Sequence, residues 1–179
     1  MGKLTVTSFI TLDNVVEDPH LWSGKFQSDD TGALNADVLG EADAMLLGRV
    51  TYEGFAAAWP SRSGDPFSDR FNSMPKHVVS TTLDRADWNN STIIADDVFD
   101  RVRALKEEQN VLVWGSPTLV QGLMEQGLVD EYVLLVSPIV RGKGIRLFRD
   151  AGDQHDLRIT ESTVLGGGML ALRMTPAAA

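Results

Sequence analysis

Three segments that combine glycine with hydroxyl or basic side chains are the parts of this sequence best suited to bind a charged ligand. They are Gly48-Arg49-Val50-Thr51, Ser80-Thr81-Thr82 and Gly115-Ser116-Pro117-Thr118, and each directly follows a short apolar run. Glycine lets a phosphate approach the backbone closely, while hydroxyl groups and the N-terminus of a following helix favour an anion. Three such segments on one sheet would suit an extended ligand with several phosphates, such as a dinucleotide.

Each of these motifs also has a plainer explanation. A glycine after a strand is often part of a turn, and a serine or threonine before a helix is often only its cap. None of the three is a GxGxxG or a Walker loop, so neither a Rossmann nor a P-loop site has its usual fingerprint. Taken alone, the residues indicate a nucleotide-sized anion site.

Apolar runs alternate with helical patterns along most of the chain, and they predict where the motifs lie. Strands that alternate with helices predict a mainly parallel sheet with helices on both faces, and Gly166-Gly167-Gly168 predicts a closing antiparallel hairpin. In such an open α/β sheet, ligands bind beyond the carboxyl ends of the strands. We expect one domain over residues 1–176 and a disordered tail at 177–179. The expected strands are 4–10, 44–47, 77–79, 92–95, 111–114, 132–136, 157–163 and 169–175, and the expected helices are 31–40, 51–59, 66–73, 97–109 and 119–124. Asp65-Pro66 is the signal for the cap and first turn of the third helix.

The composition excludes several classes of site and partner. The 179 residues include no cysteine, which excludes disulfides and thiolate metal sites, and the three histidines lack metal-ligand spacing, so no metal is expected. The net charge of −9 makes nucleic acid a poor partner. The N-terminal segment has the pattern of a strand and not of a signal peptide, and no window approaches a membrane span. A cytoplasmic protein with a small-molecule substrate is expected.

Four blocks of the sequence resemble the dihydrofolate-reductase-like family that includes the reductase domain of riboflavin biosynthesis. DAMLLGRVTYEGFAAAWP resembles the family's LLGRxTYExF…W block, and PKHVVSTTL resembles PKxVxSxTL. VLVWGSPTLVQGLMEQGLVDEYVLLVSPIVRGKGIRLF resembles GxxxLxxxLxxxGLVDELxLxxxPVxLGxGxxLF, and SFITLDN is similar to the opening SLDG strand. The blocks follow the family's order over residues 3–173. The resemblance implies a dihydrofolate-reductase-like three-layer fold, with NADPH as the cofactor.

The resemblance also implies which residues hold NADPH. The GRxT block contacts phosphates, the hydroxyl pair lies near the adenosine ribose and its 2′-phosphate, and the glycine turn with its helix N-terminus surrounds the pyrophosphate. The implied residues are Gly48, Arg49, Thr51, Ser80, Thr81, Gly115, Ser116, Thr118 and Leu119. The alternative for Arg49 is a surface ion pair. Two positions depart from the family: Ser116 replaces a frequent second glycine, and Asn14 replaces a usual glycine, although asparagine tolerates positive φ well.

The candidate catalytic residues are Asp30 and Asp13. Dihydrofolate reductases place a carboxylate near the start of the helix before the GRxT strand, where Asp30 lies; its alternative role is the N-cap of that helix. The family counterpart of Asp13 faces the pocket. Trp22 lies in the long irregular segment that follows Asp13, where it either covers a nicotinamide or substrate ring or anchors the loop.

These implications favour an NADPH-dependent reductase that transfers a hydride to a small heterocyclic substrate. It would resemble 5-amino-6-(5-phosphoribosylamino)uracil reductase or dihydrofolate reductase. The alternative is a non-catalytic NADP(H)- or nucleotide-binding module of the same fold. Proteins of this family commonly form dimers, and the apolar segment 127–140 and the closing hairpin lie near a predicted sheet edge, so a homodimer is expected.

Overall fold

The computed structural model describes residues 1–150 and 152–177, and its centre is an eight-stranded sheet with the order β4-β3-β2-β5-β1-β6-β8-β7. Strands β1 to β6 all run parallel, whereas β8 is antiparallel to β6 and to β7. The predicted mainly parallel sheet with a closing antiparallel hairpin is therefore confirmed. The strands are β1 (Leu4–Thr11), β2 (Ala44–Gly48), β3 (Lys76–Val79), β4 (Ser91–Ile94), β5 (Val111–Trp114), β6 (Glu131–Ser137), β7 (Leu157–Val164) and β8 (Leu170–Pro176).

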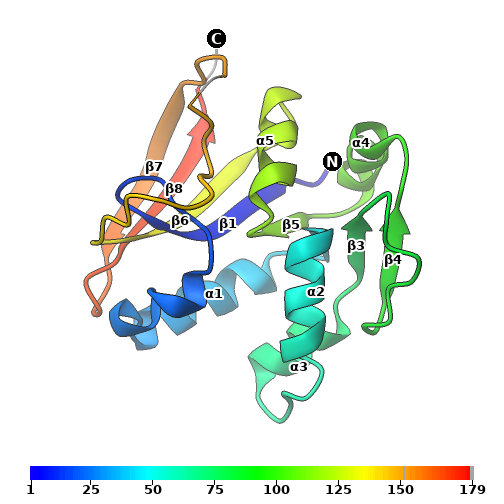
Figure 1. Cartoon of the computed structure of the whole chain (residues 1–179), viewed down its shortest axis with the longest axis horizontal. Helices are drawn as coiled ribbons and strands as arrows, with labels where there is room; N and C mark the ends of the chain where they lie inside the picture. Colours follow the sequence, from blue (N-terminus) through cyan, green and yellow to red (C-terminus); the bar gives the residue numbers. More distant parts are fainter. Residues whose placement is uncertain (151, 178–179) are drawn as a thin grey trace.

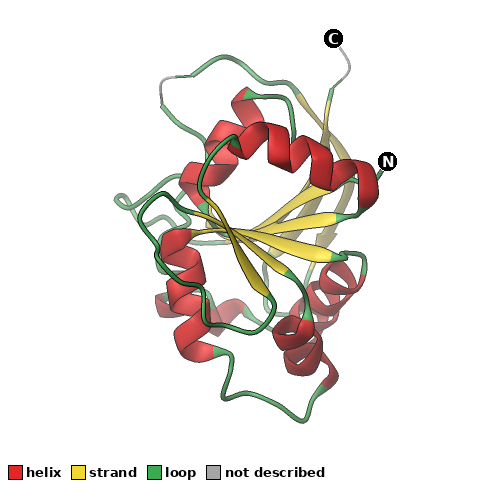
Figure 2. Cartoon of the chain, turned by 90° about the vertical axis from the view of Figure 1, so that its right-hand side faces the viewer, coloured by secondary structure: helices red, strands yellow, loops and turns green. Residues whose placement is uncertain are grey.

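Helices cover both faces of the sheet, as Figure 2 shows with the sheet seen edge-on. Two apolar clusters, one on each face, attach these helices to the strands: Val38 and Phe71 belong to the first cluster, and Val102 and Leu123 belong to the second. The three-layer α/β fold is confirmed. No helix in the two described ranges is long and apolar enough to cross a membrane. One face carries α1 (Asp29–Gly40), α2 (Arg49–Ala58) and α3 (Pro66–Ser73), and the other carries α4 (Val98–Glu108) and α5 (Pro117–Glu125).

The position of β5 determines which loops meet. The chain builds the sheet outward through β2, β3 and β4, and α4 then returns it so that β5 lies between β2 and β1 (Figure 1). Val111 consequently pairs with both Ala44 and Leu4. The helices α2 and α5 therefore begin at neighbouring strand ends but on opposite faces. We call the edge formed by the last residues of the parallel strands, Thr11, Gly48, Val79, Ile94, Trp114 and Ser137, the carboxyl edge.

Several predicted boundaries are wrong by two residues. Helix α1 begins at Asp29 instead of Thr31, and its N-cap is Ser28, which forms a capping box with Thr31. Asp30 is therefore inside the first turn and is not the cap. Helix α2 begins at Arg49 instead of Thr51, directly after β2.

Two other predictions concern the second helix connection and the C-terminus. The predicted cap of α3 is confirmed, because the Asp65 carboxylate accepts the Ser68 N–H at 3.0 Å. In the predicted disordered tail, Ala177 donates its N–H to the Asp156 carbonyl at 2.8 Å, so this residue is attached to the domain. Residues 178–179 lie outside the described residues.

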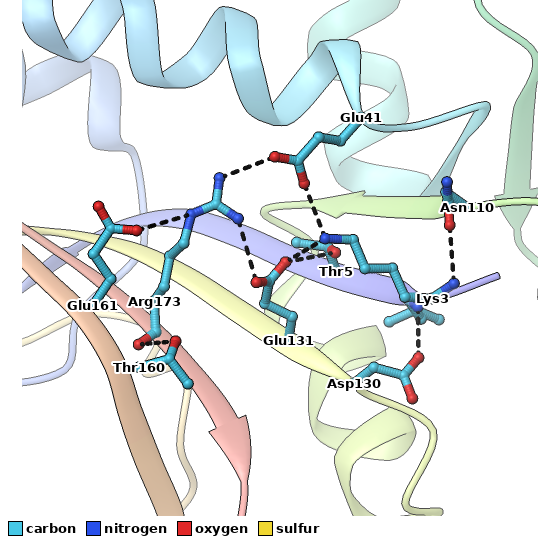
Figure 3. Close-up of polar contacts among 10 residues, drawn as sticks. Lys3, Thr5, Glu41, Asn110, Asp130, Glu131, Thr160, Glu161 and Arg173 are labelled. Carbon is cyan, nitrogen blue, oxygen red and sulfur yellow. Dashed lines mark hydrogen bonds and ion pairs between the residues drawn. The ribbon is translucent and has the colours of Figure 1, made fainter.

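Four charged side chains form a closed ring at the edge opposite the carboxyl edge. Lys3 contacts both Glu41 and Glu131 at 2.9 Å, and Arg173 contacts the same two carboxylates at 3.3 Å (Figure 3). We call these four residues the ionic ring. Because they come from the start of β1, the end of α1, β6 and β8, the ionic ring attaches the closing hairpin to the parallel part of the sheet.

Lys76 is a buried cation whose partners are carbonyl oxygens. Its side chain is fully buried, and its Nζ donates to the carbonyls of Asn72, Met74 and Asn89 at 2.9, 2.8 and 3.0 Å. It also lies 4.1 Å from the centre of the Trp88 ring, which favours a cation. Burial lowers the pKa of Lys76 to about 8. Lys76 therefore joins the end of α3, the start of β3 and the segment before β4.

We expect Lys76→Met to lower the free energy of unfolding by roughly 3 kcal/mol, because three buried carbonyls lose their donor. Urea unfolding followed by tryptophan fluorescence measures this loss. The matched control is Lys143→Met, which removes an exposed lysine and should change stability by less than about 0.5 kcal/mol. Equal effects of the two substitutions would contradict the role assigned to Lys76.

Candidate cofactor and active site

The loops that begin α2 and α5 are hydrogen-bonded to each other at the carboxyl edge. The Gly48 N–H donates to Ser116 Oγ at 3.0 Å, and the Ser116 N–H donates to Thr51 Oγ1 at 3.1 Å. Figure 1 shows the two helices on either side of β5, from which this contact follows. Two of the three predicted motifs, separated by more than sixty residues of chain, thus form one local structure. We call Gly48, Thr51, Gly115 and Ser116 the phosphate cradle.

The phosphate cradle has the electrostatic character of an anion site. The first turns are Arg49-Val50-Thr51 in α2 and Pro117-Thr118-Leu119 in α5, and neither contains a carboxylate. The first N–H groups of a helix have no partner within it, and the helix dipole places partial positive charge there. Gly115 has a φ of 63°, and a Cβ on it would lie 3.6 Å from Thr51 Cγ2. The absence of that Cβ leaves room at the backbone, so these residues fit the phosphates of NADPH.

Arg49 adopts the alternative predicted for it. Its Nη1 donates to both carboxylate oxygens of Glu53, at 2.9 and 3.2 Å, one turn further along α2. Both side chains are about half exposed, at 44% and 48%. The ion pair therefore occupies the guanidinium that the family resemblance assigns to a cofactor phosphate.

The motif after β3 consists of one buried and one exposed hydroxyl. Ser80 Oγ accepts the N–H groups of Thr82 and Leu83 at 3.2 and 2.9 Å, which fixes the turn that follows the strand. Thr81 is exposed at this turn. In α5, Thr118 is exposed, whereas Leu119 packs against the apolar cluster beneath the cradle. The structure thus brings Gly48, Thr51, Gly115, Ser116 and Leu119 together and places Ser80 and Thr81 one strand away.

Asp13 holds a loop and stays ionised. Its carboxylate accepts the Thr11 hydroxyl at 2.7 Å and the N–H groups of Arg141 and Gly142 at 3.0 and 2.6 Å. These donors, the Thr11 hydroxyl first among them, lower the pKa of Asp13 to about 2. Asp13 is therefore a carboxylate at neutral pH and does not carry the proton that a general acid would donate. It attaches the loop after β6 to the end of β1.

The other two candidates for the substrate side, Asp30 and Trp22, also form hydrogen bonds within the protein. The Asp30 carboxylate accepts the Gly166 N–H at 3.0 Å and so holds the β7–β8 turn against α1. Trp22 is only 6% exposed, and its Nε1 donates to the Glu17 carbonyl at 2.8 Å. Of the two roles considered for Trp22, the structure shows the loop anchor.

Asn14 has the predicted positive φ, at 68°. Its side-chain amide also bonds twice to the backbone of Phe148, donating to the carbonyl at 2.7 Å and accepting the N–H at 3.0 Å. Sequence reasoning missed this pairing, and it missed Gly167 as well: a Cβ on that glycine would overlap the Phe26 carbonyl. The GGG run is a visible signal, but it indicates a turn without indicating what the turn touches.

Comparison with known proteins identifies the family. Residues 2–171 match the RibD C-terminal domain family. The chain belongs to this family. The uncharacterized protein YyaP of Bacillus subtilis is 27% identical to this chain over 143 residues, which cover 76% of this chain and 75% of the relative.

Two solved structures share the fold of this RibD C-terminal domain. A protein from Shewanella sp. PV-4 assigned to riboflavin biosynthesis has a TM-score of 0.79 at 19% identity, covering 98% of this chain and 99% of the other. The diaminohydroxyphosphoribosylaminopyrimidine deaminase/5-amino-6-(5-phosphoribosylamino)uracil reductase of Thermotoga maritima has a TM-score of 0.69 at 15% identity, covering 98% of this chain and 57% of the other. The predicted membership and fold are thereby confirmed.

Within this RibD C-terminal domain, Ser116 has an unusual conformation. Its φ of 54° lies in the left-handed region, directly after Gly115 with a φ of 63°. A non-glycine residue there is strained by about 1–2 kcal/mol. Its Oγ partly offsets the strain because it accepts the Gly48 N–H. The serine that replaces the family's frequent glycine therefore exchanges backbone freedom for a contact between the two cradle loops.

We expect Ser116→Ala to be less stable than Ser116→Gly by about 1 kcal/mol in urea unfolding. Both substitutions remove the hydroxyl, but only glycine relieves the left-handed strain, so the difference between them isolates the strain. An alanine variant as stable as the glycine variant would show that the backbone here is unstrained.

Proposed function

We propose that this RibD C-terminal domain is an NADPH-dependent reductase that transfers a hydride to a small heterocyclic substrate. The observation that carries the proposal is the convergence of α2 and α5, whose carboxylate-free first turns are joined through Ser116 at the carboxyl edge. The family typically uses NADPH, and the name of the Thermotoga maritima neighbour includes 5-amino-6-(5-phosphoribosylamino)uracil reductase. A pair of helix N-termini that share one anion suits the pyrophosphate of a dinucleotide.

In this proposal the chain binds and orients, and NADPH supplies the hydride when it is bound. The phosphate cradle binds the pyrophosphate, while Arg49, Ser80 and Thr81 face the adenosine end, because β3 lies on the β2 side of the cradle. The other side of β5 is β1, so the reacting end of the cofactor extends toward the end of β1. There the substrate would meet Asp30 and the loop that Asp13 holds.

Purified protein titrated with NADPH should show quenching of tryptophan fluorescence with energy transfer to the nicotinamide. Arg49→Ala should weaken the binding of NADPH about tenfold, because a charge-assisted hydrogen bond to a phosphate is lost. The control is Arg149→Ala, whose guanidinium is similarly exposed, at 46%, and pairs with Glu125 at the far end of α5. Failure of the wild-type protein to bind NADPH would contradict the proposal.

Turnover assays with pterins and ribosylaminopyrimidines then separate an enzyme from a binding module. NADPH oxidation that depends on such a compound supports the reductase. Tight NADPH binding without turnover of any of them would favour the non-catalytic module.

We further propose that the protein is a homodimer that associates through its closing hairpin. Strand β7 ends the described sheet, and nearly all its residues are exposed on both faces. Ile159 and Val164 are 58% and 73% exposed. An unpaired edge strand that exposes apolar side chains favours association with another chain unless it is covered.

Light scattering at micromolar concentration should give twice the 19.5 kDa chain mass. The double substitution Ile159→Lys and Val164→Lys should reduce it to the mass of a monomer, because two buried charges would oppose the contact. Val50→Lys is the matched control, since Val50 on α2 is equally exposed, at 73%. A monomeric wild-type protein would exclude the dimer.

A further inference from the structure

Helix α2 has two flanks, and Glu53 lies on the one that faces away from the phosphate cradle. A hollow of about 400 Å³ separates this flank from the segment after β3, and Glu53 lines it together with Ala56, Leu83 and Arg85. Leu83 belongs to the turn that Ser80 fixes, because its N–H donates to Ser80 Oγ at 2.9 Å. The flank of α2 that carries Glu53 therefore borders the motif assigned to the adenosine ribose and its 2′-phosphate.

The guanidinium of Arg49 is drawn to this same flank. Its Nη1 lies 2.9 Å from the Glu53 carboxylate, whereas Thr51 of the same helix turns toward α5 and accepts the Ser116 N–H. Arg49 and Thr51 thus serve different sides of α2. Gly48, directly before Arg49, pairs with Val79, directly before Ser80. A phosphate bound near Ser80 and Thr81 would therefore lie on the side of α2 to which the Arg49 guanidinium turns, and the cradle is left to backbone N–H groups and hydroxyls.

The position of Arg49 gives it little value for the stability of the helix. It is the first residue of α2, where the positive end of the helix dipole disfavours a cation. The order Arg49 then Glu53, with the acid toward the C-terminus, is also the weaker orientation of an i,i+4 pair. Arg49 thus lies at the end of the helix that disfavours a cation, and its ion pair with Glu53 adds little to helix stability. This position indicates a binding role for the arginine.

We propose, resting on the proposed NADPH function, that Glu53 is a specificity-determining residue that competes with the 2′-phosphate of the cofactor for Arg49. Binding of NADPH breaks the Arg49–Glu53 pair and places the guanidinium on the phosphate. NADH lacks that phosphate and leaves the pair intact. Glu53 consequently lowers the affinity for NADPH and has little effect on the affinity for NADH. It therefore reduces the preference of the protein for NADPH over NADH.

The pair is weak enough to be displaced. Both side chains are about half exposed, and exposed ion pairs contribute little because water and salt screen them. A phosphate dianion offers Arg49 more charge and more acceptor oxygens than one carboxylate does. The same screening keeps the penalty from Glu53 modest, so its removal should change affinity by a small and measurable factor.

The test is a double-mutant cycle on NADPH and NADH dissociation constants, measured by fluorescence at fixed low ionic strength. Glu53→Gln should lower the dissociation constant for NADPH about three- to fivefold and change that for NADH by less than about 1.5-fold. In an Arg49→Ala background the same substitution should change the dissociation constant for NADPH by less than about 1.5-fold. Glu125→Gln is the matched control: it removes a carboxylate paired with Arg149 at the same 2.9 Å and with the same 48% exposure, and it should alter neither constant.

Three results would overturn the competition. They are no tightening in Glu53→Gln, equal tightening of NADPH and NADH, and tightening that persists without Arg49. In each of these cases wild-type protein that binds NADPH keeps the proposed function intact. Wild-type protein that binds neither nucleotide contradicts the proposed function itself, and the cycle then refutes both. Urea unfolding of Glu53→Gln should match the wild type, which excludes a change in fold as the cause.

Discussion

The insertion of β5 between β2 and β1 is the constraint on which the rest of the carboxyl edge depends. Parallel strands expose their ends on the same side, and the reversal of strand order around β5 sends α2 and α5 to opposite faces. Only this arrangement lets Ser116 bond to Gly48 and Thr51. If β5 were added at the outer edge, the same sequence motifs would be separated by the width of several strands. The proposed anion site thus depends on strand order before it depends on any side chain.

The two ends of the parallel strands differ in charge and in backbone conformation. The ionic ring of Lys3, Glu41, Glu131 and Arg173 closes one edge with paired charges. The opposite edge contains left-handed residues, including Asn14, Gly115, Ser116 and Gly142. Conformational strain concentrates where proteins bind ligands, and it persists because the surrounding structure determines it. Here the unfavourable left-handed backbone of Asn14 and Ser116 is held in place by hydrogen bonds to Phe148 and Gly48.

Local patterns predicted the strands, the helices and the cradle, because hydrophobic periodicity and strand-end glycines act over a few residues. The positive φ at Asn14 and the cap of α3 at Asp65 were equally local and are confirmed. The errors are of another kind. Asp30 was expected to cap α1, but Ser28 does so, since a reciprocal bond with Thr31 satisfies more backbone than one carboxylate would.

The bonds of Asp13 and Asp30 join residues more than a hundred positions apart, at Gly142 and Gly166. No window of sequence contains both partners of such a bond. The three carbonyls around Lys76 were hidden for a related reason: a lysine in a strand gives no sign that backbone oxygens of α3 and the next loop will surround it. Long-range polar contacts of this type are fixed by the fold and not by the local pattern.

The central place of β1 has a consequence for synthesis of the chain on the ribosome. Its neighbours in the sheet are β5 and β6, so Leu4 waits for Val111 and Thr5 waits for Glu131. At translation rates of about 5–20 residues per second, the first strand emerges roughly 6 to 25 s before its second partner. Until β5 emerges the segment LTVTSFIT has neither of its edges paired, and until β6 emerges only one edge can be paired. The core therefore closes only near the end of synthesis, and a nascent chain stalled before residue 131 would present a strand that invites aggregation or a chaperone.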